Sequence, residues 1–141
     1  MLNTIKIIIA FLLLIGCDPV DNRFEVRNNS DKTIFLYLSK EKTFQLTHHY
    51  INPSGDTIYT ADLYDYIRPN SIHKESIIGV GNSWKMFIET FPDSTLQLFV
   101  FDKETLIEMS ESDVITQNDV LKHFSLHIDM LEELKWKIDY E

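Results

Sequence analysis

The chain has 141 residues, of which 44% are hydrophobic and 25% are charged, and its formal net charge is −9. This length gives room for one domain, and the ordinary apolar content argues against a wholly disordered chain. The acidic balance, with no basic stripe to offset it, argues against nucleic acid as a partner and against an electrostatic grip on anionic lipid.

The N-terminal segment combines a weakly basic start with a short apolar run. Lys6 precedes ten residues, Ile7 to Gly16, that carry no charged or strongly polar group. As a helix this run spans about 15 Å, half the thickness of the hydrocarbon core of a bilayer. The pattern predicts a removable signal peptide over residues 1–16 rather than a membrane span. Its removal takes the net charge from −9 to −10, because Lys6 is its only charged side chain.

Cys17 is the only cysteine and directly follows the apolar run. A single cysteine excludes an internal disulfide and a zinc site built from several thiolates. Leu14, Gly16 and Cys17 resemble the lipobox of bacterial lipoproteins, with Leu three positions before the cysteine and a small residue directly before it. The resemblance implies that the Cys17 thiol receives a diacylglycerol, that cleavage occurs before it, and that the new amino terminus is acylated. An ordinary secretory signal ending in a chance cysteine is the alternative.

Residues 17–23 are predicted to be the lipidated cysteine and a short polar tether. Asp18 and Asp21 resemble the acidic surface-export signals of Bacteroidota lipoproteins, whereas Asp directly after the cysteine indicates inner-membrane retention in enteric bacteria. We expect a protein lipid-anchored to a membrane of the cell envelope. The outer membrane of a Gram-negative bacterium is favoured, and the leaflet stays open.

Residues 24–141 are predicted to form a single domain of short strands separated by turn residues. The expected strands are residues 24–28, 33–38, 44–46, 58–60, 64–67, 74–80, 84–90, 96–101 and 136–140. Residues 118–124 and 129–134 have helical character, and residues 91–95 have turn chemistry. The pattern favours a mainly β fold, an antiparallel immunoglobulin-like β-sandwich with one or two short helical segments near the C-terminus. A small β-barrel is the alternative.

Three stretches of the chain resemble small uncharacterised lipoproteins of Bacteroidota. The matching positions are Val26, Asn28 and Ser30, then Leu96 to Asp102, then Leu134, Trp136, Ile138 and Tyr140. These are core positions and none of them is catalytic. The resemblance therefore implies a fold and a compartment, and it brings no activity with it.

Two histidines are the first candidates for chemistry. His123 and His127 share a face if their segment is helical, and Asp119 and Asp129 then complete a possible metal site. However, residues 126–128 look extended, and His123 lacks the adjacent Glu of a zinc hydrolase motif. Surface histidines are the favoured interpretation, and no metal or other cofactor is predicted. His48 and its neighbour are interpreted as loop residues.

Aromatic side chains offer the other candidate surfaces. The stretch from Tyr59 to Tyr66 lies among Asp56, Asp62 and Asp65 and has the residues to frame a sugar or a cation. An acidic loop over tyrosines that cap the core edge is the favoured interpretation. Trp84 and Trp136 are interpreted as core residues, with a groove for a peptide or glycan as the alternative.

No nucleophile elbow, dinucleotide fingerprint or phosphate-binding loop occurs in the sequence. We therefore expect a non-catalytic binding or structural module, anchored to the membrane through the lipid on Cys17, with an envelope protein or a glycan as partner. The alternative is a small glycan or peptidoglycan hydrolase, which needs two carboxyl groups roughly 5–10 Å apart across a cleft.

Overall fold

The structure, a computed structural model, describes residues 19–43, 46–47, 49–51, 54, 57–59, 66–104 and 114–141. The predicted leader, Cys17 and residues 60–65 lie outside these ranges. Among the residues that are described, no helix is both long enough and apolar enough to cross a membrane.

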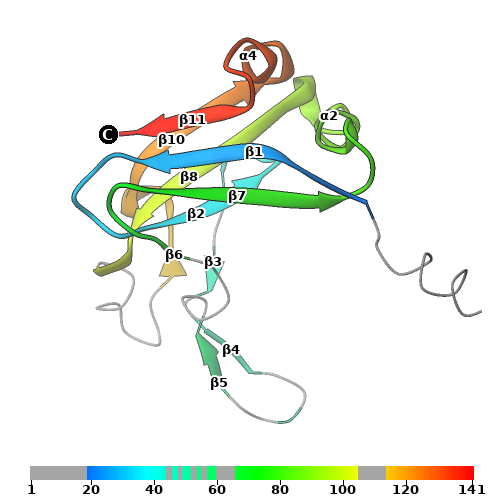
Figure 1. Cartoon of the computed structure of the whole chain (residues 1–141). Helices are drawn as coiled ribbons and strands as arrows, with labels where there is room; N and C mark the ends of the chain where they lie inside the picture. The colour runs from blue at the N-terminus through cyan, green and yellow to red at the C-terminus, as the bar shows by residue number, and fades with distance from the viewer. Residues whose placement is uncertain are drawn as a thin grey trace, which may run out of the picture.

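Most of the strands belong to two sheets (Figure 1). The first sheet has the order β11 (Lys137–Tyr140), β1 (Val20–Asn28), β7 (Ser71–Ile78), in which β1 runs antiparallel to β7 and parallel to β11. The second sheet is antiparallel, with the order β10 (Val120–His127), β8 (Thr95–Asp102), β2 (Ile34–Ser39), β6 (Tyr66–Ile67).

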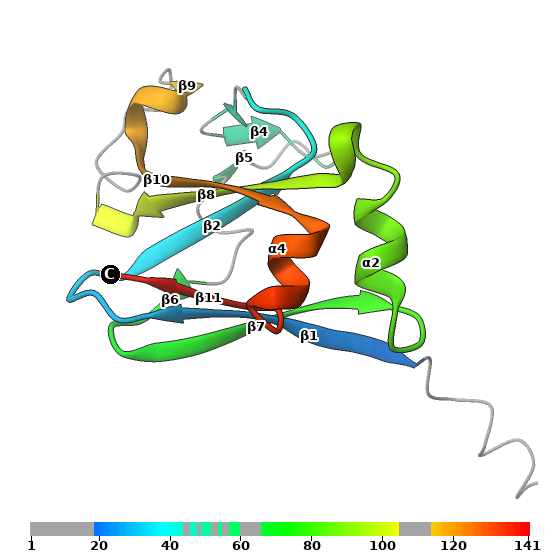
Figure 2. The ribbon, with the colours of Figure 1, turned by 90° about the horizontal axis from the view of Figure 1, so that it is seen from above.

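Shorter elements complete the described chain. Two small ladders pair β3 (Leu46–Thr47) with β9 (Val114–Ile115) and β4 (His49–Ile51) with β5 (Thr57–Tyr59). Two helices, α2 (Ser83–Ile88) and α4 (Ile128–Glu133), lie at one end of the two sheets (Figure 2).

The two sheets form the layers of a sandwich, with the main core between them (Figure 2). The first sheet contributes buried side chains from β1 and β11, the second from β2, β6, β8 and β10, and both helices add to the same core. These core residues are Phe24, Val26, Ile34, Leu36, Ile67, Trp84, Ile88, Leu96, Leu98, Val100, Leu126, Ile128, Leu131, Trp136, Ile138 and Tyr140. The predicted mainly β sandwich is confirmed, and the sheets do not close into the alternative barrel.

Strand β8 is buried on both faces, which explains its nearly continuous apolar sequence. Leu96, Leu98 and Val100 face the main core, while Phe99 and Phe101 lie on the outer face in a second cluster with Phe35 and Ile115. The rings of Phe35 and Phe101 are stacked with centroids 5.3 Å apart. Because both faces of β8 are covered, its sequence does not alternate between apolar and polar residues as that of a half-exposed strand does.

The structure corrects two predicted elements. The predicted strand 84–90 is helix α2, in which Trp84 and Ile88 are buried four positions apart on one face. The predicted helical segment 118–124 lies mostly in β10, because pairing with β8 holds residues 120–124 extended. Both segments are short and contain only a few large apolar side chains, so their periodicity is ambiguous and tertiary pairing decides.

Other predicted boundaries shift by a few residues. Strand β1 begins at Val20, so residues 20–23, predicted as tether, are part of the first sheet. The predicted helical turn 129–134 is α4, and it is the helix near the C-terminus, whereas α2 lies mid-chain. The predicted closing strand is β11.

The hydrogen bonds of the Asn28 side chain explain why Asn28 and Ser30 lie two positions apart. Its side chain is fully buried, and its amide donates to the carbonyl oxygens of Lys32, Ile67 and Arg68 at 2.7, 3.0 and 3.1 Å. Its side-chain oxygen accepts from the backbone N–H and the hydroxyl of Ser30, at 3.0 and 2.7 Å. Asn28 therefore ties β1 to the following turn and to β6, which is a structural role.

We expect Asn28→Ala to lower the free energy of unfolding by about 2–3 kcal/mol, because it leaves buried carbonyl groups without their donor. Asn29→Ala is the matched control, because that side chain is exposed, and it should change stability by less than about 0.5 kcal/mol. Urea unfolding of the two variants measures both values. Equal stability of the two variants would contradict the role given to Asn28.

Candidate functional site

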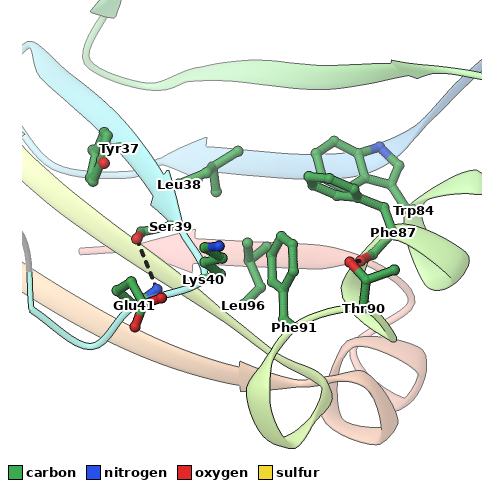
Figure 3. A pocket seen from close by; sticks show the side chains of 10 residues that line it. All are labelled: Tyr37, Leu38, Ser39, Lys40, Glu41, Trp84, Phe87, Thr90, Phe91 and Leu96. Atoms are coloured by element: carbon green, nitrogen blue, oxygen red, sulfur yellow. Dashed lines mark hydrogen bonds between the residues drawn. The ribbon is translucent and has the colours of Figure 1, made fainter.

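A cavity of about 640 Å³ opens at the end of the sandwich where α2 lies (Figure 3). It lies between the end of β2 on one side and α2, the turn that follows it and the start of β8 on the other. Its lining residues are Tyr37, Leu38, Ser39, Lys40, Glu41, Trp84, Phe87, Thr90, Phe91 and Leu96. Both the volume and the mostly apolar lining are typical of a ligand site.

One wall of this pocket consists of three aromatic rings from α2 and the turn after it. The centroids of Trp84 and Phe87 are 6.1 Å apart with an interplanar angle of 69°, and those of Phe87 and Phe91 are 4.7 Å apart at 71°. These are favourable edge-to-face arrangements. Positions 84, 87 and 91 follow helical spacing, so one short helix and its last turn place all three rings on one side.

The exposure of this wall changes along the helix. Trp84 is 4% exposed and belongs to the core, whereas Phe87 is 43% exposed at the rim. The Trp84 indole N–H is buried, and none of the described residues accepts a hydrogen bond from it. In Figure 3 this nitrogen lies on the side of the ring next to β1, while the six-membered ring is directed toward Leu38. Trp84 thus offers the pocket an apolar surface rather than a donor.

The polar lining is mostly committed to the protein itself. The Ser39 hydroxyl accepts from the backbone N–H of Glu41 at 2.9 Å, and the Thr90 hydroxyl donates to the carbonyl oxygen of Phe87 at 2.6 Å. Lys40 and Glu41 are exposed and bring one charge of each sign to the rim. The lining therefore has an apolar floor and a charged rim.

Helix α2 is attached to β1 through the carboxylate of Asp21, which is 4% exposed. Its two oxygens accept from Arg23 Nε at 2.9 Å and from the backbone N–H of Trp84 at 3.2 Å. Burial alone would raise the pKa of Asp21, but the hydrogen bonds from Arg23 and Trp84 hold it below its ordinary value. The guanidinium of Arg23 also lies 5.2 Å from the centroid of the Trp136 ring.

The two tryptophans singled out from the sequence therefore have different surroundings. Trp84 is both a core residue and part of a pocket wall, so the two interpretations of it hold together. Trp136 is 6% exposed, packs in the core and lies under Arg23. Phe87 and Phe91 are not singled out from the sequence, because Phe87 falls in the predicted strand 84–90 and Phe91 in the predicted turn 91–95. Their helical spacing from Trp84 is the signal that could have found them.

The histidine candidates are not brought together as a metal site. His123 stacks on Phe99, with centroids 4.3 Å apart, and its Nε2 lies 2.8 Å from Gln97 Oε1. Burial lowers the pKa of His123 below its ordinary value. His127 instead caps α4, where its Nδ1 accepts from the backbone N–H of Asp129 at 3.2 Å. Within the described ranges no three His, Cys, Asp or Glu side chains are grouped to hold a metal ion.

Little of the predicted tyrosine surface can be placed. Asp56, Asp62 and Asp65 lie outside the part of the chain that the structure describes. Tyr66 is half-buried in β6, and the ammonium group of Lys103 lies 4.4 Å from the centroid of its ring. Tyr66 thus contacts a cation that belongs to the chain itself.

Comparisons of the chain with protein-family models, with curated proteins and with solved structures gave no significant match. The chemistry of the pocket is set by its lining. Six of its ten lining side chains are aromatic or aliphatic, and Glu41 is the single carboxylate among them. Such a lining suits an apolar group, which the charged rim could orient.

We expect Asp21→Asn to lower the free energy of unfolding at neutral pH by about 2 kcal/mol, because a buried hydrogen-bonded charge is lost. The folded-state pKa of Asp21 is depressed, so its contribution is present above pH about 4 and is lost as the pH falls through the folded pKa. The variant should therefore lose less stability than the parent between pH 5 and pH 2. Urea unfolding across this pH range measures the difference.

Asp139→Asn is the control for Asp21→Asn. Asp139 is 61% exposed, and its nearest cation, Arg27 Nε, lies 3.8 Å away. We expect a change below about 0.5 kcal/mol, as for other exposed pairs. Faster amide exchange at Trp84 in Asp21→Asn alone would show that α2 is loosened; unchanged exchange would contradict the anchoring role of Asp21.

Proposed function

We propose that the chain is a lipid-anchored lipoprotein of the cell envelope that acts as a non-catalytic binding module for a protein partner. The observation that carries the binding role is the pocket beside α2, with its wall of Trp84, Phe87 and Phe91. In this proposal the pocket receives an apolar or aromatic side chain of the partner, and Lys40 and Glu41 meet polar groups around it. Aromatic side chains in a concave site are typical anchors of protein interfaces.

The lining favours a protein over a glycan. A sugar ring needs several hydrogen-bonding groups to replace those it gives up to water. Of the three hydroxyls in the lining, those of Ser39 and Thr90 already bond to the backbone, and the third belongs to Tyr37. The rings of Phe87 and Phe91 also meet edge to face, so they offer no single flat platform for a sugar. A glycan remains the second outcome that a binding test distinguishes.

The residues that line the pocket fit a binding role better than they fit the hydrolysis of a glycosidic bond. Hydrolysis of a glycosidic bond by paired carboxylates needs two such groups across one cleft. The pocket has Glu41 alone, and the buried carboxylates of Asp21 and Asp102 are each in an ion pair, with Arg23 at 2.9 Å and with Lys32 at 2.6 Å. These two side chains are engaged in holding the fold together.

The anchoring part of the proposal is supported by the sequence around Cys17. The apolar run and the lipobox-like residues precede it directly, and β1 begins three residues after it. A domain held this close to a bilayer meets its partner at high effective concentration. The outer membrane of a Gram-negative bacterium is the proposed location.

We expect Cys17→Ala to abolish incorporation of radiolabelled palmitate and to leave the protein uncleaved or released from the membrane, because the acyl chains attach through this thiol. The measurement is acyl labelling followed by fractionation of cells that express the full chain. Asn29→Ala, at an exposed position far from the lipobox in sequence, should keep the label. Labelling of the Cys17→Ala protein would contradict the anchor.

We expect a photo-reactive amino acid at position 87 to crosslink the lipoprotein to one discrete protein partner in intact cells. The same residue at position 86 is the matched control, because Met86 is exposed on the same helix but does not line the pocket. Phe87→Ser should then reduce co-purification of that partner from gently solubilised membranes by about tenfold, the loss that one buried aromatic contact produces. An isolated monomer without crosslinks at position 87 would contradict the binding role, and crosslinks to glycan alone would favour the second outcome.

A further inference from the structure

Four exposed apolar side chains gather at the end of the sandwich where β1 begins. Val20, Ile78, Val80 and Met86 are 54%, 75%, 72% and 66% exposed. Single exposed apolar side chains are ordinary on a protein surface, but a cluster of them marks an interaction site. We call these four residues the end patch.

Backbone contacts link the segments that carry the four residues of the end patch. Val20 and Ile78 are register partners across β1 and β7, and the N–H of Gly79 donates to the carbonyl oxygen of Pro19 at 2.7 Å. The carbonyl oxygen of Val80 accepts from the N–H groups that begin α2, which carries Met86. In Figures 1 and 2 the start of β1, the end of β7 and α2 lie side by side at one end of the molecule.

Two cations near the end patch are each paired with a carboxylate. Arg23 is paired with the buried Asp21, and Lys85 Nζ lies 2.8 Å from Glu132 Oε1. Neither Arg23 nor Lys85 therefore adds an unpaired positive charge beside the patch. Such a surface suits an apolar neighbour rather than a charged one.

The proposed lipid on Cys17 indicates which apolar neighbour covers the end patch. Cys17 precedes Val20 by three residues, so even a fully extended chain places Val20 no more than about 11 Å from the lipidated residue. The headgroup layer is itself roughly 5–8 Å thick on each side of the hydrocarbon core. The end patch is therefore held within reach of the bilayer surface at all times.

We propose that the end patch rests on the lipid bilayer, so that the domain is docked on the membrane in one orientation rather than swinging on its anchor. The proposal rests on the lipidation of Cys17 proposed above. Val20, Ile78, Val80 and Met86 enter the headgroup region, and α2 lies next to the membrane surface. The pocket beside α2 then opens close to the membrane, where it meets a partner that is itself membrane-bound.

The test uses the lipidated full-length protein with one introduced cysteine. Since Cys17 is the only cysteine and is blocked by lipid, Ile78→Cys provides one free thiol for an environment-sensitive fluorophore. Ile72→Cys is the matched control, because it is the same residue type on the same strand and the same exposed face, 51% exposed. It lies six positions away, about 20 Å along the strand. Val80→Cys is a second patch variant.

The labelled proteins are reconstituted into phosphatidylcholine vesicles with and without nitroxide-bearing lipids. The nitroxide quenches the fluorophore only where the fluorophore reaches the headgroup layer, roughly 5–8 Å thick, or the lipid beneath it. We therefore expect quenching at positions 78 and 80 to be about threefold or more stronger than at position 72. Raised salt should leave this difference unchanged, because the patch is apolar. Equal quenching at positions 72, 78 and 80 would overturn the docking.

Two further outcomes separate a failure of the docking from a failure of the anchor. A blue shift at position 78 without quenching by lipid-borne nitroxide would mean that a protein or a second copy covers the patch, and this overturns membrane docking while the anchor stands. Flotation of the protein with vesicles, together with a Cys17 thiol that resists alkylation, tests the anchor separately. Failure of flotation, or a reactive Cys17, overturns the anchor and the docking that rests on it.

Discussion

The carboxylate of Asp21 holds the arrangement on which the pocket and the end patch both depend. It joins the beginning of β1 to the first turn of α2 by accepting from Arg23 and from the Trp84 N–H. One side of α2 carries the aromatic wall of the pocket, and the other side carries Met86 of the end patch. A helix of six residues has little stability of its own, so its position is set by such contacts and by the burial of Trp84 and Ile88.

An irregularity in β1 makes this contact possible. The register of β1 against β7 shifts between Asp21 and Phe24. In a regular strand, residues three apart face opposite sides, but here both Asp21 and Phe24 are buried. The shift therefore turns Asp21 toward α2 while Phe24 and Val26 stay in the core, and it leaves Val20 exposed at the end of the strand. One local departure from regular pairing thus serves the helix, the core and the end patch.

The sandwich could be predicted because its central strands carry strong local patterns. Residues 96–101 and 33–38 are rich in aromatic and β-branched side chains, and they pair as β8 and β2. The alternation of residues 136–140 likewise matches the burial of Ile138 and Tyr140. Residues 84–90 and 118–124 were assigned to the wrong element because large apolar side chains in a short segment fit both periods. Their conformations are decided by contacts with β1 and β8, which are distant in sequence.

The pocket was harder to predict from the sequence than the sandwich, because its two sides lie far apart in the chain. Its two sides come from residues 37–41 and residues 84–96, and only the paired sheet brings these segments together. Trp84 could be singled out by residue type alone, whereas Phe87 gains its position from the helix. The role of Asn28 was also hidden, since its partners Ile67 and Arg68 lie about forty positions away. Residue type suggested the candidates, and long-range pairing determined their surroundings.

One short helix, α2, contributes to both the pocket and the end patch, and this couples two properties of the molecule. A tether of a few residues restricts the distance of a domain from a membrane but not its direction, so a pocket on a freely swinging domain would face its partner only part of the time. In the proposed docking, an apolar contact beside the tether removes that freedom before a partner binds. The orientational entropy lost on forming the complex is then smaller, which strengthens binding without any additional contact in the pocket. Because Asp21 fixes α2 to β1, the orientation of the domain and the shape of the pocket depend on the same buried carboxylate.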